Sequence, residues 1–409
     1  MSFFRSTTVP QGSVARQGKD SESSIYLDHQ ATTPLDSRVL DRMLPYLTDQ
    51  YANAASHHAA GRAAAAAVDE AREQVAGLVG GRASGVVFTS GATEANNLAI
   101  RGLAEAADTR LGVVTVATEH PSVLEPVAAL AAKGAPVLVL LVGPDGEVDL
   151  EQLTAALDEQ TLVVSVMAAN NEIGTLHPLP QIVDIAHRAG ALVHCDATQL
   201  IGKLPLDVGA IGIDLASMSA HKLYGPKGVG ALVLTRDAAR RLSPQLLGGG
   251  HERGHRSGTL NVPGCVGFGE AAAIAADAMQ EEAPRLTLLA KRLLSGIEVV
   301  GDVTLNGPAT DRLPGNLNVS IKGTAGDDLM LRMPSLAVST GSACSSASPR
   351  PSHVLLAIGR THEEAASALR FGVGRFTTEE EIDRAVGTIV DTIKTVRTES
   401  RGALTGRPA

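Results

Sequence analysis

The chain has 409 residues, of which 44% are hydrophobic and 19% are charged, and its formal net charge is −9. This length and composition are typical of a globular protein with about two domains. The acidic balance argues against a nucleic-acid-binding surface, and no apolar run is long enough to span a membrane, so we expect neither nucleic-acid binding nor membrane attachment.

Residues 1–24 are polar and show neither a helical nor a strand period, which predicts a disordered tail. Their Ser, Thr and Arg content and late acidic residues also have a weak resemblance to a transit peptide. From Ile25 onward, short apolar runs alternate with Ala-rich amphipathic stretches. The runs predict strands at 85–90, 111–117, 136–142, 161–168, 191–196, 214–219 and 230–235, with helices between them such as 94–107 and 179–190. This alternation predicts an α/β fold with a mostly parallel, doubly wound sheet. A ligand should then bind outside the carboxyl ends of the strands.

Small residues follow the first of these strands. Gly91, Ala92 and Thr93 stand directly before a helix whose first turn carries Glu94. Free backbone N–H groups and a hydroxyl at a helix N-terminus form an anion site, typically for phosphate. A plain helix cap is an equally good interpretation of this segment alone.

The strands at 111–117 and 191–196 end near titratable side chains. His120 precedes Pro121, which suits a first helical position. Asp196 ends a strand that we expect to be buried, where a carboxylate is costly unless it is paired. A protonated ring nitrogen of a cofactor would be a suitable partner, although a helix cap would also explain the residue.

Lys222 and His221 follow the strand at 214–219 and precede a Gly/Pro turn. A flexible surface lysine is the simplest interpretation. An amine buried near other cations, however, loses its proton more easily and can form Schiff bases. His221 could orient a phosphate or cap the turn.

The pattern changes near residue 280, where we place a domain boundary. A charged helix is predicted at 281–300 and a last helix at 378–400. Between them, "STGSACSSASP" (339–349) places Cys344 among serines, alanines and glycine, where a thiol has room to react. The segment lies between an apolar run (335–338) and a helix that Pro351 can begin and Gly359 can end.

Arg370 lies in a strand-like segment near the second helix of this region, and arginine suits the bidentate binding of a carboxylate. A surface salt bridge would also explain it. Together, the phosphate site, the acid for a ring nitrogen, the Schiff-base lysine and the carboxylate-binding arginine describe a pyridoxal-phosphate enzyme that acts on an amino acid.

The three cysteines, Cys195, Cys265 and Cys344, lie far apart and show no metal-ligand spacing. We therefore expect a reducing, cytoplasmic compartment and packing roles for Cys195 and Cys265. His251 and His255 lie in a segment too rich in glycine to form a helix with ligands at i and i+4, so no metal site is predicted.

Nine segments resemble, in order and spacing, the signature segments of cysteine desulfurases, which are class V aminotransferase-like, fold-type I pyridoxal-phosphate enzymes. They are "YLDHQATTP", "FTSGATEANNLAI", "TEHPSV", "NNEIGT", "HCDATQ", "SAHKLYGPKG", "GGGHERGHRSGT", "STGSACSSAS" and "LRFGVGRFTTEEE". The resemblance extends from Ile25 to Glu381. The family fold implies a large cofactor-binding domain at 36–280. Residues 25–35 and 281–409 would form a smaller α+β domain that carries the catalytic cysteine.

The resemblance also implies a role for each matching residue. Lys222 would bind pyridoxal 5′-phosphate covalently, Asp196 would pair with its ring nitrogen, and Gln199 would contact its phenolic oxygen. His120 would stack on the ring and transfer protons. The phosphate would be held by Gly91, Ala92, Thr93, Ser219 and His221, together with Thr259 of the neighbouring subunit of a homodimer. Asn171 and Arg370 would bind the carboxylate of the substrate.

The implied reaction removes sulfur from L-cysteine, gives L-alanine, and leaves a persulfide on Cys344 that passes to a protein acceptor. Iron–sulfur assembly, tRNA thiolation and DNA phosphorothioation are the candidate pathways. Two departures from the family pattern, a short polar C-terminal tail and Pro334 before the cysteine segment, favour a dedicated acceptor over a general iron–sulfur scaffold.

Three alternatives to a cysteine desulfurase remain open on the sequence alone. A selenocysteine lyase, or a desulfurase of the second subgroup, has a different catalytic-cysteine segment. An ordinary aminotransferase would have no use for Cys344. A non-catalytic scaffold with this fold would not need both Lys222 and Asp196.

Overall fold

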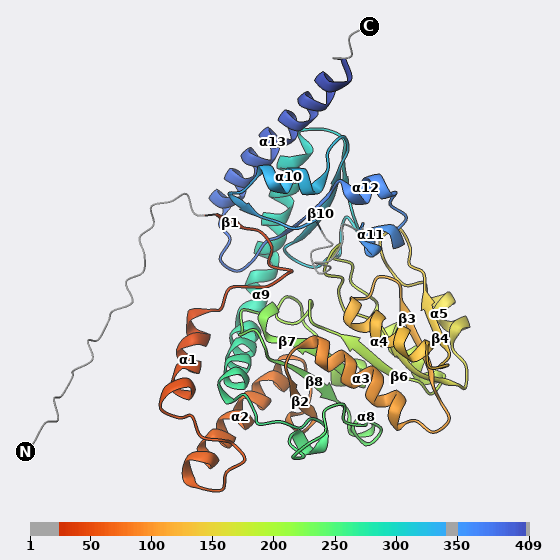
Figure 1. Ribbon diagram of the computed structural model, residues 1–409, viewed down its shortest axis with the longest axis vertical. Coiled ribbons are helices and arrows are strands. Elements are labelled where there is room, and N and C mark those ends of the chain that lie inside the picture. The colour runs from red at the N-terminus through yellow and green to blue at the C-terminus, as the bar shows by residue number, and fades with distance from the viewer. Residues whose placement is uncertain (1–23, 341–350, 406–409) are drawn as a thin grey trace, which may run out of the picture.

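The computed structural model describes residues 24–340 and 351–405, and its largest element is a seven-stranded sheet (Figure 1). The strand order is β2-β8-β7-β6-β5-β3-β4. These strands are β2 (Val86–Thr89), β3 (Gly112–Val116), β4 (Val137–Leu140), β5 (Thr161–Ser165), β6 (Leu192–Asp196), β7 (Leu215–Ser219) and β8 (Gly230–Leu234). Neighbouring strands are parallel except at β8, which is antiparallel to both β2 and β7. The seven predicted strands and the mostly parallel sheet are confirmed.

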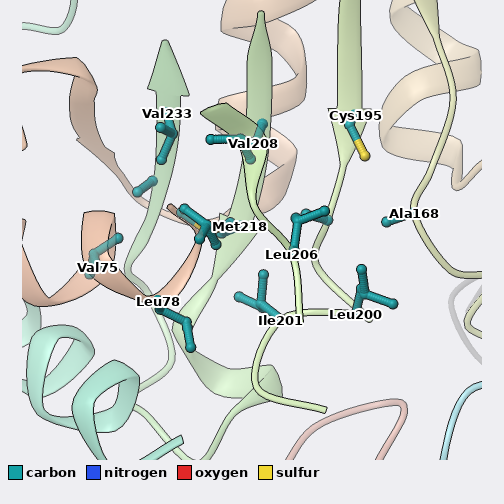
Figure 2. Packing of buried hydrophobic residues seen from close by; sticks show 14 of the residues in the cluster. Val75, Leu78, Ala168, Cys195, Leu200, Ile201, Leu206, Val208, Met218 and Val233 are labelled. Carbon is teal, nitrogen blue, oxygen red and sulfur yellow. The ribbon is translucent and has the colours of Figure 1, made fainter. Parts of the chain in front are cut away.

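Helices cover both faces of this sheet, because successive residues of each strand pack on opposite sides. Val113 contributes to a core beneath α3 (Ala92–Ala106) and α4 (Pro121–Ala131). Val114 contributes to the opposite core, beneath α2 (Ala59–Leu78), α6 (Leu179–Arg188) and the first half of α9 (Val262–Glu298). Figure 2 shows part of this second core, where Cys195 of β6 and Met218 of β7 lie among aliphatic side chains.

The strands β2 and β4 form the two edges of the sheet, and β4 differs from all the other strands in its exposure. Leu138 and Val139 are 45% and 43% exposed, whereas all residues of the other six strands are buried. An apolar run therefore predicts the strand here but not its position in the sheet.

A separate core surrounds a three-stranded antiparallel sheet with the order β12-β10-β9. Its strands are β9 (Val303–Leu305), β10 (Asn316–Ile321) and β12 (Ala368–Gly372). Beside it, β1 (Ile25–Tyr26) pairs with β11 (Leu336–Ala337), so Ile25 and Leu27 are buried in this core. The core also takes side chains from α10 (Gly326–Arg332), α13 (Glu379–Thr405) and the second half of α9.

The helix predicted at 281–300 begins much earlier, at Val262, and runs as α9 from a core of the seven-stranded sheet into the core of the three-stranded sheet (Figure 1). The predicted boundary near 280 thus falls inside a continuous helix, and the division into two domains stays a prediction. The helix α10 ends at Arg332, two residues before Pro334. The helix predicted after the cysteine segment is α11 (His353–Ala357), which begins after Ser352 and not at Pro351, and Gly359 follows it with a φ of +84°. No helix among the described residues is long and apolar enough to cross a membrane.

The remaining elements are short or peripheral. The helices are α1 (Ser37–Thr48), α5 (Leu150–Ala156), α7 (Val208–Ile211), α8 (Arg236–Arg240), α11 (His353–Ala357) and α12 (His362–Ala366). Three 3₁₀ turns, η1 (Ala83–Gly85), η2 (Ala220–Lys222) and η3 (Glu252–Gly254), complete the described secondary structure.

Candidate active site

A cavity of about 510 Å³ opens at the carboxyl ends of the parallel strands, where the sequence predicted a ligand site. Among the predicted site residues, those that line it are Gly91, Ala92, Thr93, His120, Asn171, Asp196, Gln199, Ser219, His221, Lys222 and Arg370. Thr259 does not line this cavity and is exposed. Cys344 lies outside the described residues. One chain thus brings together the predicted residues except these two.

One end of the cavity is built to hold an anion. Gly91, Ala92 and Thr93 form the N-terminus of α3, where no side chain caps the free N–H groups. Gly91 has a φ of +154°, and a Cβ atom on Gly230 would lie 2.7 Å from the Gly91 Cα, so neither position tolerates a side chain. The cation of Lys227, which the sequence analysis missed, lines the same cavity.

The buried carboxylate of Asp196 lies at the end of β6 and is held by two donors. The Thr198 backbone N–H donates to its Oδ1 at 3.0 Å, and the Asn96 side chain donates to its Oδ2 at 2.8 Å. Among the described residues no cation forms an ion pair with Asp196. Since a buried anion requires compensation, this carboxylate suits a protonated ring nitrogen.

Asn96 connects Asp196 to the predicted proton carrier. Its Nδ2 also donates to Ser122 Oγ at 2.8 Å, and this hydroxyl lies 2.8 Å from His120 Nδ1. The Ser122 backbone N–H donates to the same ring nitrogen at 3.1 Å. Nδ1 therefore acts as an acceptor, and the neutral ring of His120 carries its proton on Nε2. Burial lowers the pKa of His120, so the ring is neutral near pH 7.

Lys222 follows β7 in the turn η2, and its Nζ donates to the backbone oxygens of Gln30 and Ala31 at 2.6 and 2.7 Å. Other cations surround it. Burial, reinforced by the charge of Lys222, lowers the pKa of Lys203 to about 7. Burial together with Lys222, Lys227 and Lys203 lowers the pKa of His221 to about 4. At neutral pH, His221 is therefore uncharged and Lys203 is partly deprotonated.

Arg370 reaches the cavity from β12 of the smaller sheet. Its guanidinium forms a 2.9 Å ion pair with Asp28 and lies 3.4 Å from the backbone oxygen of Asn171. The buried Nε has no hydrogen-bond partner among the described residues. Asp28 fixes one side of the planar group, and such a group can bind a substrate carboxylate with its remaining donors.

The described residues on both sides of the Cys344 segment are attached beside this cavity. Ser339 pairs through its backbone with Arg370. On the other side, Ser352 Oγ donates to Glu172 at 2.5 Å, and His353 Nε2 donates to the backbone oxygen of Glu119 at 2.9 Å. The described flanking residues Ser339 and Ser352 therefore lie near the predicted substrate site, since Ser339 pairs with Arg370 and Ser352 contacts Glu172, the neighbour of Asn171.

The cavity suits the predicted cofactor, because buried polar atoms in its wall have no partner among the described residues and can bind a ligand. Gln199 Oε1 and Thr198 Oγ1 are buried without a hydrogen-bond partner among the described residues, and both residues line the cavity. The uncapped helix, Lys222 and Asp196 match the phosphate, aldehyde and ring nitrogen of pyridoxal phosphate in type.

Cys195 and Cys265 are buried and unpaired, which confirms their predicted packing role. Burial raises the pKa of the Cys195 thiol well above its usual value and that of Cys265 to about 12. Neither thiol is ionised at neutral pH, so neither is a nucleophile.

The sequence analysis missed the buried residues Asn96, Ser122 and Glu119. Glu119 is fully buried, and burial together with the nearby Asp196 carboxylate holds its pKa well above the usual range. Two adjacent asparagines lie inside the segment 94–107, whose other residues favour a helix. Because asparagine is unfavourable inside a helix, this pair could have marked Asn96 as a residue with a specific role.

Comparison with known proteins gives a consistent result. The model of the family "Aminotransferase class-V" matches residues 25–385. A cysteine desulfurase IscS of Anaeromyxobacter sp. (strain Fw109-5) is 51% identical over 376 residues, which cover 91% of this chain and 93% of that protein. The solved structure of a NifS-like protein has a TM-score of 0.86 at 36% identity and covers 91% of this chain and 100% of its own. A structure of SspA in complex with cysteine has a TM-score of 0.77 at 33% identity and covers 87% of this chain and 100% of its own.

Proposed function

The chain belongs to the class-V aminotransferase family and is a pyridoxal-phosphate-dependent cysteine desulfurase, and we propose how its residues divide the reaction between them. The cofactor supplies an electron sink for negative charge at Cα of a bound amino acid. The observation that carries the proposal is the convergence of Lys222, Asp196 and Arg370 on one cavity.

Each end of the cavity has a separate binding role. Lys222 is the covalent attachment point, and its amine lies in the wall of the cavity. Asp196 compensates the positive charge of the ring nitrogen, Gln199 binds the phenolic oxygen, and the start of α3 with Ser219 and His221 binds the phosphate. Arg370 and Asn171 bind the carboxylate of L-cysteine, which is the ligand of the similar SspA structure.

His120 transfers protons at its Nε2 atom. Because its Nδ1 accepts from Ser122, the neutral ring presents an Nε2–H group to the cavity and can release this proton only after it has taken up a second one. The protonated ring can give its Nε2 proton to the substrate carbon, and Nε2 can then accept the proton of a thiol. This order suits a reaction in which the substrate carbon gains a proton and the attacking thiol loses one.

Cys344 is the sulfur acceptor in the proposal. Its thiolate attacks the sulfur of the substrate, the carbon–sulfur bond breaks, and the bonding pair remains on the substrate carbon, which takes up a proton to give L-alanine. The sulfur stays on Cys344 as a persulfide and passes to an acceptor protein. Support comes from the attachment of both flanks of the segment beside Arg370 and Glu119.

The active form is a homodimer in this proposal. Leu40, Leu44, Leu47 and Tyr51 lie at the i, i+4, i+7 and i+11 positions on and just after α1 and are 44%, 50%, 56% and 81% exposed. An exposed apolar stripe of this kind suits a second copy of the chain. Thr259 is exposed and outside its own cavity, as expected for a residue that serves the phosphate site of the partner.

We place the enzyme in the cytoplasm and favour a dedicated sulfur acceptor, as in tRNA thiolation or DNA phosphorothioation, over iron–sulfur assembly. The free thiols of Cys195 and Cys265 support the reducing compartment. Capture of only an iron–sulfur scaffold protein by the Cys344 persulfide form would contradict the preference for a dedicated acceptor.

Borohydride reduction of the protein with bound pyridoxal phosphate tests the cofactor site. Reduction makes the bond to the lysine permanent, and peptide mass spectrometry then identifies the modified residue. The proposal expects modification of Lys222, whereas modification of Lys203 or Lys227 would overturn it. L-alanine formation should disappear in Lys222→Ala and persist in Lys291→Ala, which changes an exposed lysine of α9.

A further inference from the structure

Glu94 places a carboxylate in the wall of the cavity, at the end that binds phosphate in the proposed function. Its Oε2 accepts the backbone N–H of Ser90 at 2.8 Å, so the side chain holds the turn that leads into α3 in its shape. A negative charge next to a phosphate site weakens phosphate binding unless a cation compensates it. Glu94 therefore fixes the shape of the site, but its negative charge lowers the affinity of the site for phosphate.

Arg256 compensates this charge. Its Nε donates to Glu94 Oε1 at 2.8 Å, and its second contact, from Nη2 to Oε2, is 3.4 Å long. The side chains of Arg256 and Glu94 are only 20% and 17% exposed. Burial alone would raise the pKa of Glu94, but the hydrogen bonds from Arg256 and Ser90 hold it below its usual value. The carboxylate is thus ionised and paired.

The segment that carries Arg256 is fastened to the strand that leads into the same turn. Glu252 is buried, pairs with Arg72 at 2.9 Å and accepts the backbone N–H of Phe88 in β2 at 2.7 Å. Arg253 donates to the backbone oxygen of Val86 at 2.5 Å. Glu252 and Arg253 have φ values of +50° and +56°, a costly conformation for residues other than glycine that these contacts hold in place.

We propose that Arg256 is a positioning residue that sets the affinity of the cavity for a phosphate monoester dianion, by neutralising Glu94 of its own chain. The inference rests on the proposed function, because it requires the cofactor phosphate to bind at the start of α3. Glu94 supplies the shape of the turn and Arg256 removes its electrostatic cost. Three residues further on, Thr259 serves the partner subunit, so one segment supports the phosphate sites of both subunits.

Titration of the apoprotein with pyridoxal phosphate, and separately with pyridoxal, tests whether Arg256 affects the binding of the phosphate group. Arg256→Gln should weaken pyridoxal phosphate binding about tenfold, the effect of one partly buried charge. Pyridoxal lacks the phosphate, so its affinity should not change. Glu94→Gln keeps an acceptor for Ser90 and should bind pyridoxal phosphate at least as tightly as the parent protein. The double variant should therefore recover the affinity that Arg256→Gln loses.

Two controls separate this effect from damage to the fold. Arg188→Gln removes an exposed arginine that pairs with Asp184 on α6 and should change neither affinity. Arg256→Lys keeps the charge and should retain most of the affinity, and the far-ultraviolet circular dichroism spectrum of each apoprotein should match that of the parent protein. Equal weakening of both ligands in Arg256→Gln, or no recovery in the double variant, would overturn the inference. A parent protein that binds neither ligand would instead overturn the proposed cofactor site.

Discussion

Replacing Asn96 by alanine should destabilise the protein by about 3 kcal/mol, because one buried amide holds two oxygens that face the active site. Its Nδ2 donates at 2.8 Å to Asp196 Oδ2 and at 2.8 Å to Ser122 Oγ, and the residue is completely buried. A hydrogen bond to a charged group contributes about 1.5–3 kcal/mol and a neutral one about 1 kcal/mol. The better helix propensity of alanine offsets a few tenths of a kcal/mol.

Urea unfolding of the apoprotein measures this loss, and the neighbouring Asn97→Ala is its matched control. Asn97 lies on the same helix and, among the residues that the structure describes, donates only to the backbone oxygen of Thr93, so its loss should cost less than about 1 kcal/mol. Asn96→Asp should be worse than Asn96→Ala at pH 7 and should recover in weak acid, because it places a second carboxylate beside Asp196. Equal stability of Asn96→Ala and Asn97→Ala would refute the reasoning.

Three further predictions concern substrate binding, the loss of stability in acid and the residue that accepts sulfur. In Arg370→Lys the planar guanidinium and its contact with Asp28 are lost. The value of kcat/KM for L-cysteine should therefore fall about 100-fold, mainly through a higher KM, and an unchanged KM would contradict the proposal that Arg370 binds the substrate carboxylate. Burial lowers the pKa of His177 to about 4, whereas the unfolded chain takes up a proton on this residue below about pH 6.5, so the folded protein loses stability as the pH falls. Because phenylalanine does not titrate, His177→Phe should reduce the loss of unfolding free energy between pH 7 and pH 5 by about 2 kcal/mol. Urea unfolding with the same pH dependence in the variant and the parent protein would contradict this. Cys344→Ala should abolish sulfide release while the absorption band of the cofactor on Lys222 remains, and loss of the band would place Cys344 in cofactor binding instead.

The sequence predicted most of the cavity because its residues follow strand ends. The carboxyl ends of parallel strands meet at one edge of a sheet, so His120, Asp196 and Lys222 had to lie near one another once the alternation of strands and helices was recognised. Their roles needed the resemblance as well, since each side chain alone had a plain structural explanation.

The residues that support the site were not predictable in the same way. Asn96 lies inside a helix and Arg256 in a glycine-rich segment, and each acquires its partner only through tertiary contacts with Asp196 and Glu94. The edge position of β4 was hidden for a related reason, because an apolar run indicates a strand but not its neighbours.

Mass spectrometry of the intact protein after incubation with L-cysteine tests the central claim most directly. The account predicts that the mass of one sulfur atom is added, that peptide analysis places it on Cys344, and that L-alanine is formed in the same amount. Added sulfur on Cys195 or Cys265, or L-alanine formation without any sulfur on Cys344, would contradict it.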